Sequence, residues 1–306
     1  MIAFLFPGQG SQHAGMGKDL AANFPLAKQV FEEANDALGI DLAALCFKGP
    51  EEDLKLTANT QPAILTTSVA ALRVLQNETG IAPHYAAGHS LGEYSALVCA
   101  GALDFADAVR IVRQRGTFMQ EAVPVGTGGM AAILGLDTAT LDRVCKAAAQ
   151  GQVVSPANFN SAGQVVIAGH AEAVERAIEL AKENGAKRAL PLPVSAPFHC
   201  SLMVPAGERL ADVLAEVKVS DMTIPVVTNV EATPNRDASR VCQLLVDQVS
   251  VPVRWDETIG CMVKLGVDRY IEIGPGKVLA GLVKRMAKGS TAQNVQNVSD
   301  INALTV

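Results

Sequence analysis

The sequence predicts an α/β protein in which a small unit is inserted into a larger one. Strand and helix signals alternate along most of the 306 residues, and near the middle they follow a compact strand–helix–strand–strand–helix–strand order. Ala, Val, Leu and Gly dominate the composition, as in proteins whose helices pack closely on a sheet. We therefore expect a large domain made of residues 1–125 and 197–306, and a small domain made of residues 126–196.

The first part of the chain carries one strand and two long helices. Ile2–Phe6 is apolar throughout, as a buried strand would be, and the turn residues Pro7–Gly10 end it. Helical periodicity follows over Pro25–Leu38 and over Gln61–Glu78, and Asn59-Thr60 stands just before the second helix as a cap.

A second strand leads directly into a glycine-rich turn. His84–Ala87 is short and strand-like, and the chain then runs through Gly88–Gly92 into an apolar helix that ends near Gly101. Asp104–Ala122 has the pattern of a further helix.

The middle of the chain alternates strands and helices over about 65 residues. The expected elements are, in order, a strand at Met130–Leu134, a helix at Thr138–Ala149, strands at Gln152–Asn158 and Gln164–Ala168, a helix at Glu172–Asn184 and a strand at Ala189–Val194. This order fits a small ferredoxin-like unit.

The larger α/β domain resumes after this unit. Strand signals lie at Ile224–Val230 and Arg269–Ile273. One helix is predicted just after Val253, and a second from Lys277 to about Met286. The tail from Gly289 is polar and loosely patterned.

Charge and composition exclude several classes of protein. The 25 Lys and Arg against 31 Asp and Glu leave a net charge of −6, and aromatic residues make up 4%. A nucleic-acid binder would usually carry a basic domain or stripe, and single-strand binding needs aromatic platforms. The first seven residues lack a basic signal region, and no apolar run reaches the roughly 18 residues of a transmembrane helix. We expect a cytoplasmic protein without nucleic-acid or membrane partners.

The cysteines do not form a metal or redox motif. The six are widely spaced and several stand in apolar runs: Cys46, Cys99, Cys145, Cys200, Cys242 and Cys261. Buried, reduced thiols are the better interpretation, and no metal-ligand cluster is evident.

Gly88-His89-Ser90-Leu91-Gly92 is a G-x-S-x-G motif with a strand before it and a helix after it. In this context the serine sits on a cramped turn with its hydroxyl clear of the sheet, and the glycines avoid side-chain clashes. The helix that follows supplies a positive dipole and free N–H groups near the oxygen. Ser90 is the candidate nucleophile, against the alternative of a purely structural turn.

A serine nucleophile needs a base, and His199 is the favoured one. It follows a predicted strand end at which Pro197 turns the chain back from the small unit toward the large domain, so it is expected to face the cleft between them. His13, His84 and His170 are interpreted as structural, and His89, next to the serine, is expected to point elsewhere.

One arginine lies on the apolar face of a predicted helix. At 100° per residue, Arg115 falls at the centre of an apolar face, whereas Arg110 and Arg113 point away. The apolar residues of that face are Ala108, Ile111, Val112, Phe118 and Met119. A guanidinium directed inward is costly unless it is paired. Its partner is either an internal Asp or Glu or, in the functional interpretation, a substrate carboxylate.

Two glycine-rich loops could in principle bind an anionic ligand. Pro7–Gly10 follows the first strand, at the carboxyl edge of a parallel sheet, where its N–H groups could hold an oxyanion together with the N–H of Leu91. An ordinary turn is equally consistent with this loop. Ile273–Lys277 lacks the spacing of a phosphate loop and is interpreted as a turn between strand and helix.

These motifs together resemble the malonyl-CoA:acyl carrier protein transacylases. The resemblance rests on six segments that occur in family order and span nearly the whole chain: Phe6–Gln12, Gly88–Tyr94, Arg113–Gly116, Asn158–Ser161, Pro197–His199 and Gln248–Trp255. It implies an α/β-hydrolase-like large domain with a parallel sheet core and an inserted ferredoxin-like small domain.

The resemblance also implies roles for individual residues. Ser90 would be the nucleophile and His199 its base, and Gln248 would replace the acidic member of the triad, its carbonyl orienting the imidazole. Arg115 would be the clamp on the malonyl carboxylate. Gln9 and Leu91 would donate their backbone N–H groups to the oxyanion, and Asn160 and Phe198 would line the cleft.

The implied activity is ping-pong transfer of malonyl from coenzyme A to the phosphopantetheine thiol of acyl carrier protein, for fatty-acid or polyketide elongation. It uses no cofactor beyond these substrates, and nothing demands more than a monomer. The carrier is expected to be acidic, so a local basic patch must dock it. The candidates are Lys284, Arg285 and Lys288 or, in the small domain, Lys187 and Arg188.

Two other functions remain open at this point. A thioesterase or esterase could use the same serine turn, and its acid would come from Asp104, Asp107, Asp137 or Asp142, which lie between serine and histidine. A carrier-binding module without catalysis is the other alternative, and in that case Ser90 would not acylate.

Overall fold

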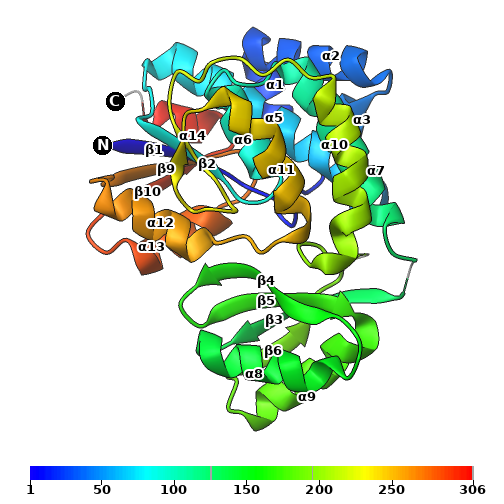
Figure 1. Ribbon diagram of the computed structural model, residues 1–306. Helices are drawn as coiled ribbons and strands as arrows, with labels where there is room; N and C mark the ends of the chain where they lie inside the picture. The colour runs from blue at the N-terminus through cyan, green and yellow to red at the C-terminus, as the bar shows by residue number, and fades with distance from the viewer. Residues whose placement is uncertain (125, 195, 305–306) are drawn as a thin grey trace.

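The molecule has two parts, each built on its own sheet (Figure 1). This structure is a computed structural model, and it describes residues 1–124, 126–194 and 196–304. The larger part contains a six-stranded sheet in the order β10-β9-β1-β2-β7-β8, and the smaller part a four-stranded sheet in the order β4-β5-β3-β6. The predicted α/β class with a large and a small unit is confirmed.

The large sheet is parallel except at one edge. Its strands are β1 (Ile2–Phe6), β2 (Tyr85–Gly88), β7 (Val226–Val227), β8 (Pro234–Asn235), β9 (Arg269–Ile273) and β10 (Thr291–Val295). Only β8 runs antiparallel, against β7. Along β1, Phe4 and Phe6 enter one core and Ala3 and Leu5 enter another, so both faces of the sheet are covered and the strand is apolar throughout.

Helices cover both faces of this sheet. They are α1 (Lys18–Asn23), α2 (Pro25–Leu38), α3 (Leu42–Lys48), α4 (Glu51–Leu54), α5 (Thr57–Thr79), α6 (Gly92–Cys99), α7 (Phe105–Glu121), α10 (Val204–Ala215), α11 (Val241–Ser250), α12 (Trp255–Lys264), α13 (Val278–Met286) and α14 (Val298–Asn302), with short 3₁₀ turns η1 (Ser201–Met203) and η2 (Ala238–Arg240). Trp255 of α12 and Leu282 of α13 pack on one face, and α2, α5 and α7 on the other.

The small part has the predicted strand–helix–strand–strand–helix–strand order. Its elements are β3 (Gly128–Leu134), α8 (Thr138–Ala149), β4 (Val154–Ser161), β5 (Gln164–His170), α9 (Ala171–Glu183) and β6 (Arg188–Pro191), and its strands pair antiparallel. Figure 1 shows α8 and α9 on the side away from the large part, so the opposite face of the sheet is turned toward it. All four strands fall within residues 126–196.

Two expectations about individual elements were wrong, and some elements formed where the sequence predicted none. Helix α5 begins at Thr57, so Asn59 and Thr60 lie within it, and the Thr60 hydroxyl donates to the carbonyl of Leu54 at 2.6 Å. The predicted strand Ile224–Val230 shrinks to two residues because the chain turns back, with the Ala232 N–H donating to the Thr228 carbonyl at 2.9 Å. The polar tail, for which no element was predicted, forms β10 and α14. The helices α10 and α11 were not predicted from the sequence either. An edge strand such as β10 is half exposed, which explains its polar pattern.

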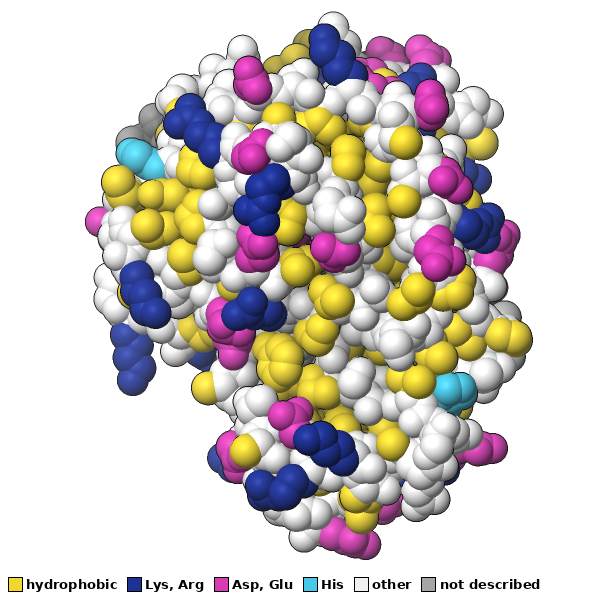
Figure 2. Space-filling model, viewed as in Figure 1, with side chains coloured by type: hydrophobic (Ala, Val, Ile, Leu, Met, Phe, Trp, Pro, Cys, Tyr) yellow, Lys and Arg dark blue, Asp and Glu magenta, His cyan; other side chains and the backbone are white. Residues whose placement is uncertain are grey.

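Backbone contacts join the two parts next to the site. The N–H of Phe159 donates to the carbonyl of Val253 at 2.9 Å, and the N–H of Val253 donates to that of Ala157 at 2.9 Å. Figure 2 shows hydrophobic side chains along this junction on the face in view. Across the described ranges, no helix combines the length and the apolarity that crossing a membrane requires.

Candidate active site

Three loops meet at the carboxyl edge of the large sheet. Pro7–Gly10 follows β1, His89–Leu91 follows β2, and Thr228-Asn229 follows β7. The three strands are adjacent and parallel, with Phe6 paired to Gly88 and Ala87 to Val227. Loops at the carboxyl ends of neighbouring parallel strands lie side by side, which is where α/β proteins place ligands.

Ser90 occupies the sharp turn between β2 and α6. Its φ is +51°, a left-handed conformation that is strained for a non-glycine residue. The flanking glycines allow this turn: a Cβ on Gly88 would lie 1.8 Å from the Gly92 carbonyl carbon, and one on Gly92 would lie 2.1 Å from the Phe6 carbonyl oxygen. The predicted serine turn is therefore present, with the hydroxyl directed into a cavity.

The serine hydroxyl is hydrogen-bonded to the predicted base. Ser90 Oγ lies 2.7 Å from His199 Nε2, and His199 Nδ1 donates to the backbone carbonyl of Gln248 at 2.8 Å. With its proton on Nδ1, a neutral imidazole presents an acceptor nitrogen to the serine. Gln248 thus orients the imidazole through its main chain, and its side chain is engaged elsewhere.

The Gln248 side chain connects three other groups of the site. Its Oε1 accepts from Arg115 Nη2 at 3.0 Å, and its Nε2 donates to the carbonyl of Ser90 at 3.1 Å and to Glu93 Oε2 at 2.7 Å. Gln248, Glu93 and Arg115 are all at most 2% exposed. Burial raises the pKa of the Glu93 carboxyl to about 7, against the opposing effects of its hydrogen bonds and of Arg115.

His199 is held in its neutral form. Burial, and after it the positive charge of Arg115, lowers the pKa of the imidazole from 6.5 to about 3, although the bond to the Gln248 carbonyl acts the other way. The imidazole is therefore free to accept a proton throughout the neutral range. Its φ of +59° shows that the base, like the nucleophile, sits on strained backbone.

Arg115 points inward, as predicted, but toward neutral partners. Nη1 donates to Gln61 Oε1 at 2.7 Å, and Nη2 donates to Ser90 Oγ at 3.2 Å as well as to Gln248. Tyr94 stacks under the guanidinium at 5.6 Å, and Nε has no hydrogen-bond partner. Within the described residues Arg115 forms no direct ion pair with a carboxylate. The internal acid that was the alternative expectation is present one step away, because Glu93 is linked to Arg115 through the Gln248 side chain and acts on its charge.

Two backbone N–H groups at the site remain unused. In the part of the chain that the structure describes, the N–H groups of Gln9 and Leu91 donate to no protein acceptor, whereas the N–H of Ser90 donates to Asn229 Oδ1 at 2.7 Å. Gln9 and Leu91 both line the cavity that contains Ser90. Their N–H groups fit a site for a developing oxyanion.

The site comprises two connected cavities. The inner one, about 110 Å³, is lined by Ser90, His199, Arg115 and Phe198 among others, and the outer one, about 270 Å³, lies between α13 and the small sheet. Both are lined by Gln9, His89, Asn158 and Leu192, so the outer cavity leads to the inner one. Its apolar wall consists of Val166, Leu192, Val278, Leu279 and Leu282.

Asn160 and His89 contact each other at the wall of the outer cavity. Asn160 lies in the strand β4 and lines that cavity, as expected of a cleft residue, and its Oδ1 is 2.8 Å from His89 Nε2. His89 does point away from Ser90, and it lines both cavities beside the Trp255 ring, 5.5 Å away. Burial lowers the pKa of its imidazole.

Other candidates from the sequence hold structural positions. His84 Nδ1 accepts from Ile2 N–H at 3.1 Å, and His170 Nδ1 accepts from Val153 N–H at 2.9 Å. Three of the four acids that a hydrolase could use are engaged elsewhere: Asp104 and Asp137 cap helices, and Asp107 pairs with Arg110. Asp142 lines a separate surface cavity that His199 also borders. Among the described residues no cluster of His, Cys, Asp and Glu could hold a metal, and all six cysteines are unpaired, three buried and three partly exposed.

Sequence reasoning missed four polar residues of the site: Gln61, Glu93, Asn158 and Asn229. Asn229 is the next-to-last residue of the predicted strand Ile224–Val230, and the parallel-sheet argument applied to Pro7–Gly10 would have placed it at the same edge. Glu93 lies three residues after Ser90 and therefore on the turn of α6 next to it.

Comparison with known proteins agrees with this geometry. The acyl transferase domain family matches residues 3–304. The malonyl CoA-acyl carrier protein transacylase of Escherichia coli K12 is 56% identical over 302 residues, which cover 99% of this chain and 98% of that protein. An acyl carrier protein S-malonyltransferase from Vibrio cholerae, solved at 1.7 Å, superposes with a TM-score of 0.96 at 53% identity, covering 99% of both chains.

A further solved structure contains a carrier. It is a type II PKS acyl-carrier protein in complex with its malonyl-transacylase, matched with a TM-score of 0.96 and 53% identity over 99% of this chain and 98% of that one. Each of these likenesses extends over the whole fold and includes the segments that form the cavities described above. The chain belongs to the acyl transferase domain family, among the malonyl CoA-acyl carrier protein transacylases.

Proposed function

We infer that this chain is an acyltransferase that moves a malonyl group from coenzyme A to the phosphopantetheine thiol of acyl carrier protein. The observation that carries the assignment is one hydroxyl with two partners: Ser90 Oγ lies 2.7 Å from the Nε2 of His199 and 3.2 Å from the guanidinium of Arg115. A nucleophile, its base and a buried cation thus converge in one cavity. The product supplies chain elongation in fatty-acid or polyketide synthesis.

The first half-reaction acylates the serine. Ser90 Oγ attacks the thioester carbonyl of malonyl-CoA while His199 Nε2 takes the hydroxyl proton. The carbonyl oxygen becomes an oxyanion that accepts from the N–H groups of Gln9 and Leu91. The C–S bond then breaks, the imidazolium returns its proton to the departing coenzyme A thiolate, and a malonyl ester remains on the serine.

The second half-reaction reverses these roles. The carrier thiol gives its proton to His199 as its sulfur attacks the ester carbonyl, and the same two N–H groups hold the oxyanion. The C–O bond to Ser90 breaks, the proton passes to Oγ, and malonyl leaves on the carrier. Both steps use only these side chains and the two substrates, so we propose that the reaction needs no cofactor.

Arg115 accounts for the choice of malonyl. In the ester the carboxylate carbon is three bonds from Oγ, within reach of a guanidinium whose Nη2 contacts that oxygen. The charge of Arg115 is buried, and its direct contacts among the described residues are neutral, so an anionic acyl group gains an ion pair that acetyl cannot form.

The open end of the outer cavity is the proposed docking site for the carrier. Arg285 Nη2 donates to Gln164 Oε1 at 3.1 Å, and Gln164 lines the cavity. Leu134 pairs with Gln164 on one side and with Arg188 on the other, so Arg188 lies on the same face of the small sheet. Arg285 of one predicted basic cluster therefore contacts a residue of the cavity wall, and Arg188 of the other lies two strands from that residue on the same face of the small sheet.

The three basic residues of the cluster Lys284, Arg285 and Lys288 do not lie on the same side of the helix α13. At about 100° per residue, Arg285 lies on the same side of α13 as Val278, whereas Lys284 lies about 120° away. Lys288 lies beyond the end of the helix at Met286. Val278, which lines the cavity, is 59% exposed and adds apolar contact surface there, and Leu190 of the edge strand β6 is 53% exposed. We therefore propose Arg285 and Arg188 as the residues that meet an acidic carrier.

Intact-protein mass spectrometry after brief incubation with malonyl-CoA tests the function, with Ser90→Ala alongside and with or without carrier protein. A malonyl adduct that requires Ser90 and moves to the carrier thiol is the expected result. An adduct lost equally fast without carrier would instead mean a thioesterase, and absence of any adduct would mean a binding module. Monomeric state and cytoplasmic location stay predictions.

A further inference from the structure

The backbone N–H of Ser90 is held by a side chain from a distant loop. Asn229 Oδ1 accepts this N–H at 2.7 Å, and Asn229 Nδ2 donates to the carbonyl of Gly88 at 2.7 Å. The amide therefore bridges two peptide groups of the nucleophile turn, one on each side of His89. Asn229 is fully buried and is not among the residues that line either cavity.

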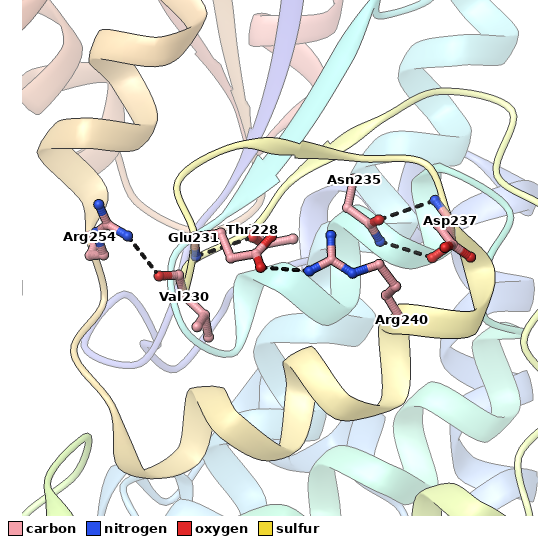
Figure 3. Close-up of polar contacts among 7 residues, drawn as sticks. All are labelled: Thr228, Val230, Glu231, Asn235, Asp237, Arg240 and Arg254. Atoms are coloured by element: carbon pink, nitrogen blue, oxygen red, sulfur yellow. Dashed lines mark hydrogen bonds and ion pairs between the residues drawn. The ribbon is translucent and has the colours of Figure 1, made fainter.

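The loop that carries Asn229 is fixed by a set of polar contacts (Figure 3). Arg254 Nη1 donates to the carbonyl of Val230 at 3.1 Å, and Arg240 pairs with Glu231 at 2.6 Å. The Glu231 N–H approaches Thr228 Oγ1 at 3.4 Å. These contacts hold the residues on both sides of Asn229, so its amide approaches the turn from a preset direction.

A buried carboxylate fixes Asn229 on its other side. Glu93 Oε2 accepts the backbone N–H of Asn229 at 3.0 Å and Gln248 Nε2 at 2.7 Å. Gln248 in turn holds His199 through its main-chain carbonyl at 2.8 Å. One carboxylate oxygen therefore links the residue that holds the nucleophile turn to the residue that holds the base.

We propose that Asn229 is a positioning residue for acyl transfer, which fixes the strained Ser90 turn so that the hydroxyl faces His199 and the N–H of Leu91 faces the oxyanion. This inference rests on the proposed role of Ser90. Binding the Ser90 N–H to Asn229 directs the next N–H, that of Leu91, into the inner cavity. Donors preset at the developing charge and a preset nucleophile lower the barrier without affecting substrate binding.

The test compares two variants of Asn229 with a matched pair at Asn235, at the end of the next strand, β8. Asn235 is also buried and also makes one acceptor and one donor contact to backbone, with the N–H and carbonyl of Asp237, both at 3.1 Å (Figure 3). Asn235→Ala and Asn235→Asp therefore remove contacts of the same kind without touching the nucleophile turn.

Rapid-quench mass spectrometry would measure the rate of malonyl adduct formation, and thermal unfolding would check folding. We expect Asn229→Ala to acylate about 10²-fold more slowly than the unmodified protein, the loss typical of a displaced nucleophile or oxyanion donor, with KM for malonyl-CoA changed less than about threefold. The Asn235 variants should acylate at the original rate even where their unfolding temperature falls.

Asn229→Asp supplies a readout that a misfolded protein would not show. Its ionised form would set a carboxylate oxygen against the Gly88 carbonyl and near Glu93, and only the protonated form can donate there. The other charged or titratable groups facing this turn are Arg115 from α7 and the imidazoles of His89 and His199. Acylation by Asn229→Asp should therefore recover at least about tenfold as pH falls from about 8 to about 5, while the unmodified protein stays level.

Each outcome decides the matter. A folded Asn229→Ala that acylates within about threefold of the original rate, or Asn235 variants that slow acylation equally, would overturn the proposal. If Asn229→Ala does not fold, an Asn229→Asp profile as level as that of the unmodified protein would overturn it. Failure of the unmodified protein to form an adduct would instead refute the proposed function.

Discussion

Arg115 donates through Nη2 to the side-chain oxygen of Gln248 at 3.0 Å, and the main chain of that same glutamine holds His199. Gln248 therefore contacts Arg115, the cation at the acyl site, and also orients His199, the base that activates Ser90. A carboxylate in the acidic position of the triad would have paired with Arg115. The neutral glutamine leaves the positive charge available for an anionic substrate.

Replacing Arg115 with Ala should remove the preference for malonyl over acetyl. We expect the malonyl rate of acylation, relative to the acetyl rate, to fall about 10²–10³-fold, the loss of a buried charge pair. The measurement is adduct formation on Ser90 with malonyl-CoA and acetyl-CoA in competition. Arg110→Ala is the control, because Arg110 lies on the same helix in a solvent-exposed pair with Asp107. An unchanged malonyl preference in Arg115→Ala would exclude the clamp.

The pH dependence of acylation should reveal the environment of His199. With its pKa lowered to about 3, the imidazole stays neutral across the neutral range, and the rate should not fall until strongly acidic pH. Arg115→Gln removes the second cause of that shift and leaves burial, so its acidic limb should move upward toward the ordinary pKa of 6.5.

A small activated ester such as p-nitrophenyl acetate suits this comparison, since it acylates serine without needing the carboxylate clamp. Coincident acidic limbs for the two proteins would show that the charge of Arg115 does not act on the base.

Glu93→Gln should stabilise the fold at alkaline pH. The folded-state pKa of Glu93, about 7, lies above its ordinary value of 4.5. Between pH 4.5 and pH 7 the folded protein therefore keeps the Glu93 carboxyl protonated while the unfolded chain has lost that proton, so the folded protein loses stability as pH rises through this range. The glutamine oxygen can still accept from Asn229 and Gln248. At about 1.4 kcal/mol per pKa unit, the variant should gain about 3 kcal/mol over the unmodified protein between about pH 4 and pH 8.

Denaturant unfolding at several pH values measures this difference. A stability gap that stays constant with pH would mean that Glu93 titrates in the folded protein as it does in the unfolded chain.

Arg285→Ala should weaken transfer to the carrier and leave acylation by malonyl-CoA unchanged. We expect KM for the carrier to rise about 3–10-fold at low salt, and the difference to shrink as ionic strength rises. Lys284→Ala is the matched control, because Lys284 is exposed on the same helix but turned away from the cavity. An equal effect of the two variants, or none, would remove Arg285 from the docking site.

Much of this site followed from local sequence alone. The G-x-S-x-G turn requires glycines at Gly88 and Gly92 because any Cβ there would meet backbone, and a periodic helix directs Arg115 inward whatever surrounds it. The strand and helix order of the small unit likewise depends on periodicity that neighbouring residues carry. The position of His199 after Pro197 suggested it as the base, and resemblance to a known family supported that choice and alone supplied Gln248.

The tertiary structure decided what those residues contact. Gln248 orients His199 through its main chain, not its side chain. The guanidinium of Arg115 donates directly to side-chain amides and to the Ser90 hydroxyl, although the sequence allowed a direct contact with a carboxylate equally well. Asn229 reaches Ser90 across 139 positions of the chain because β7 lies beside β2 in the sheet. Periodicity reports which face of an element is buried, but the partner of a buried polar group comes from another element, and only the packed fold brings the two within hydrogen-bond distance.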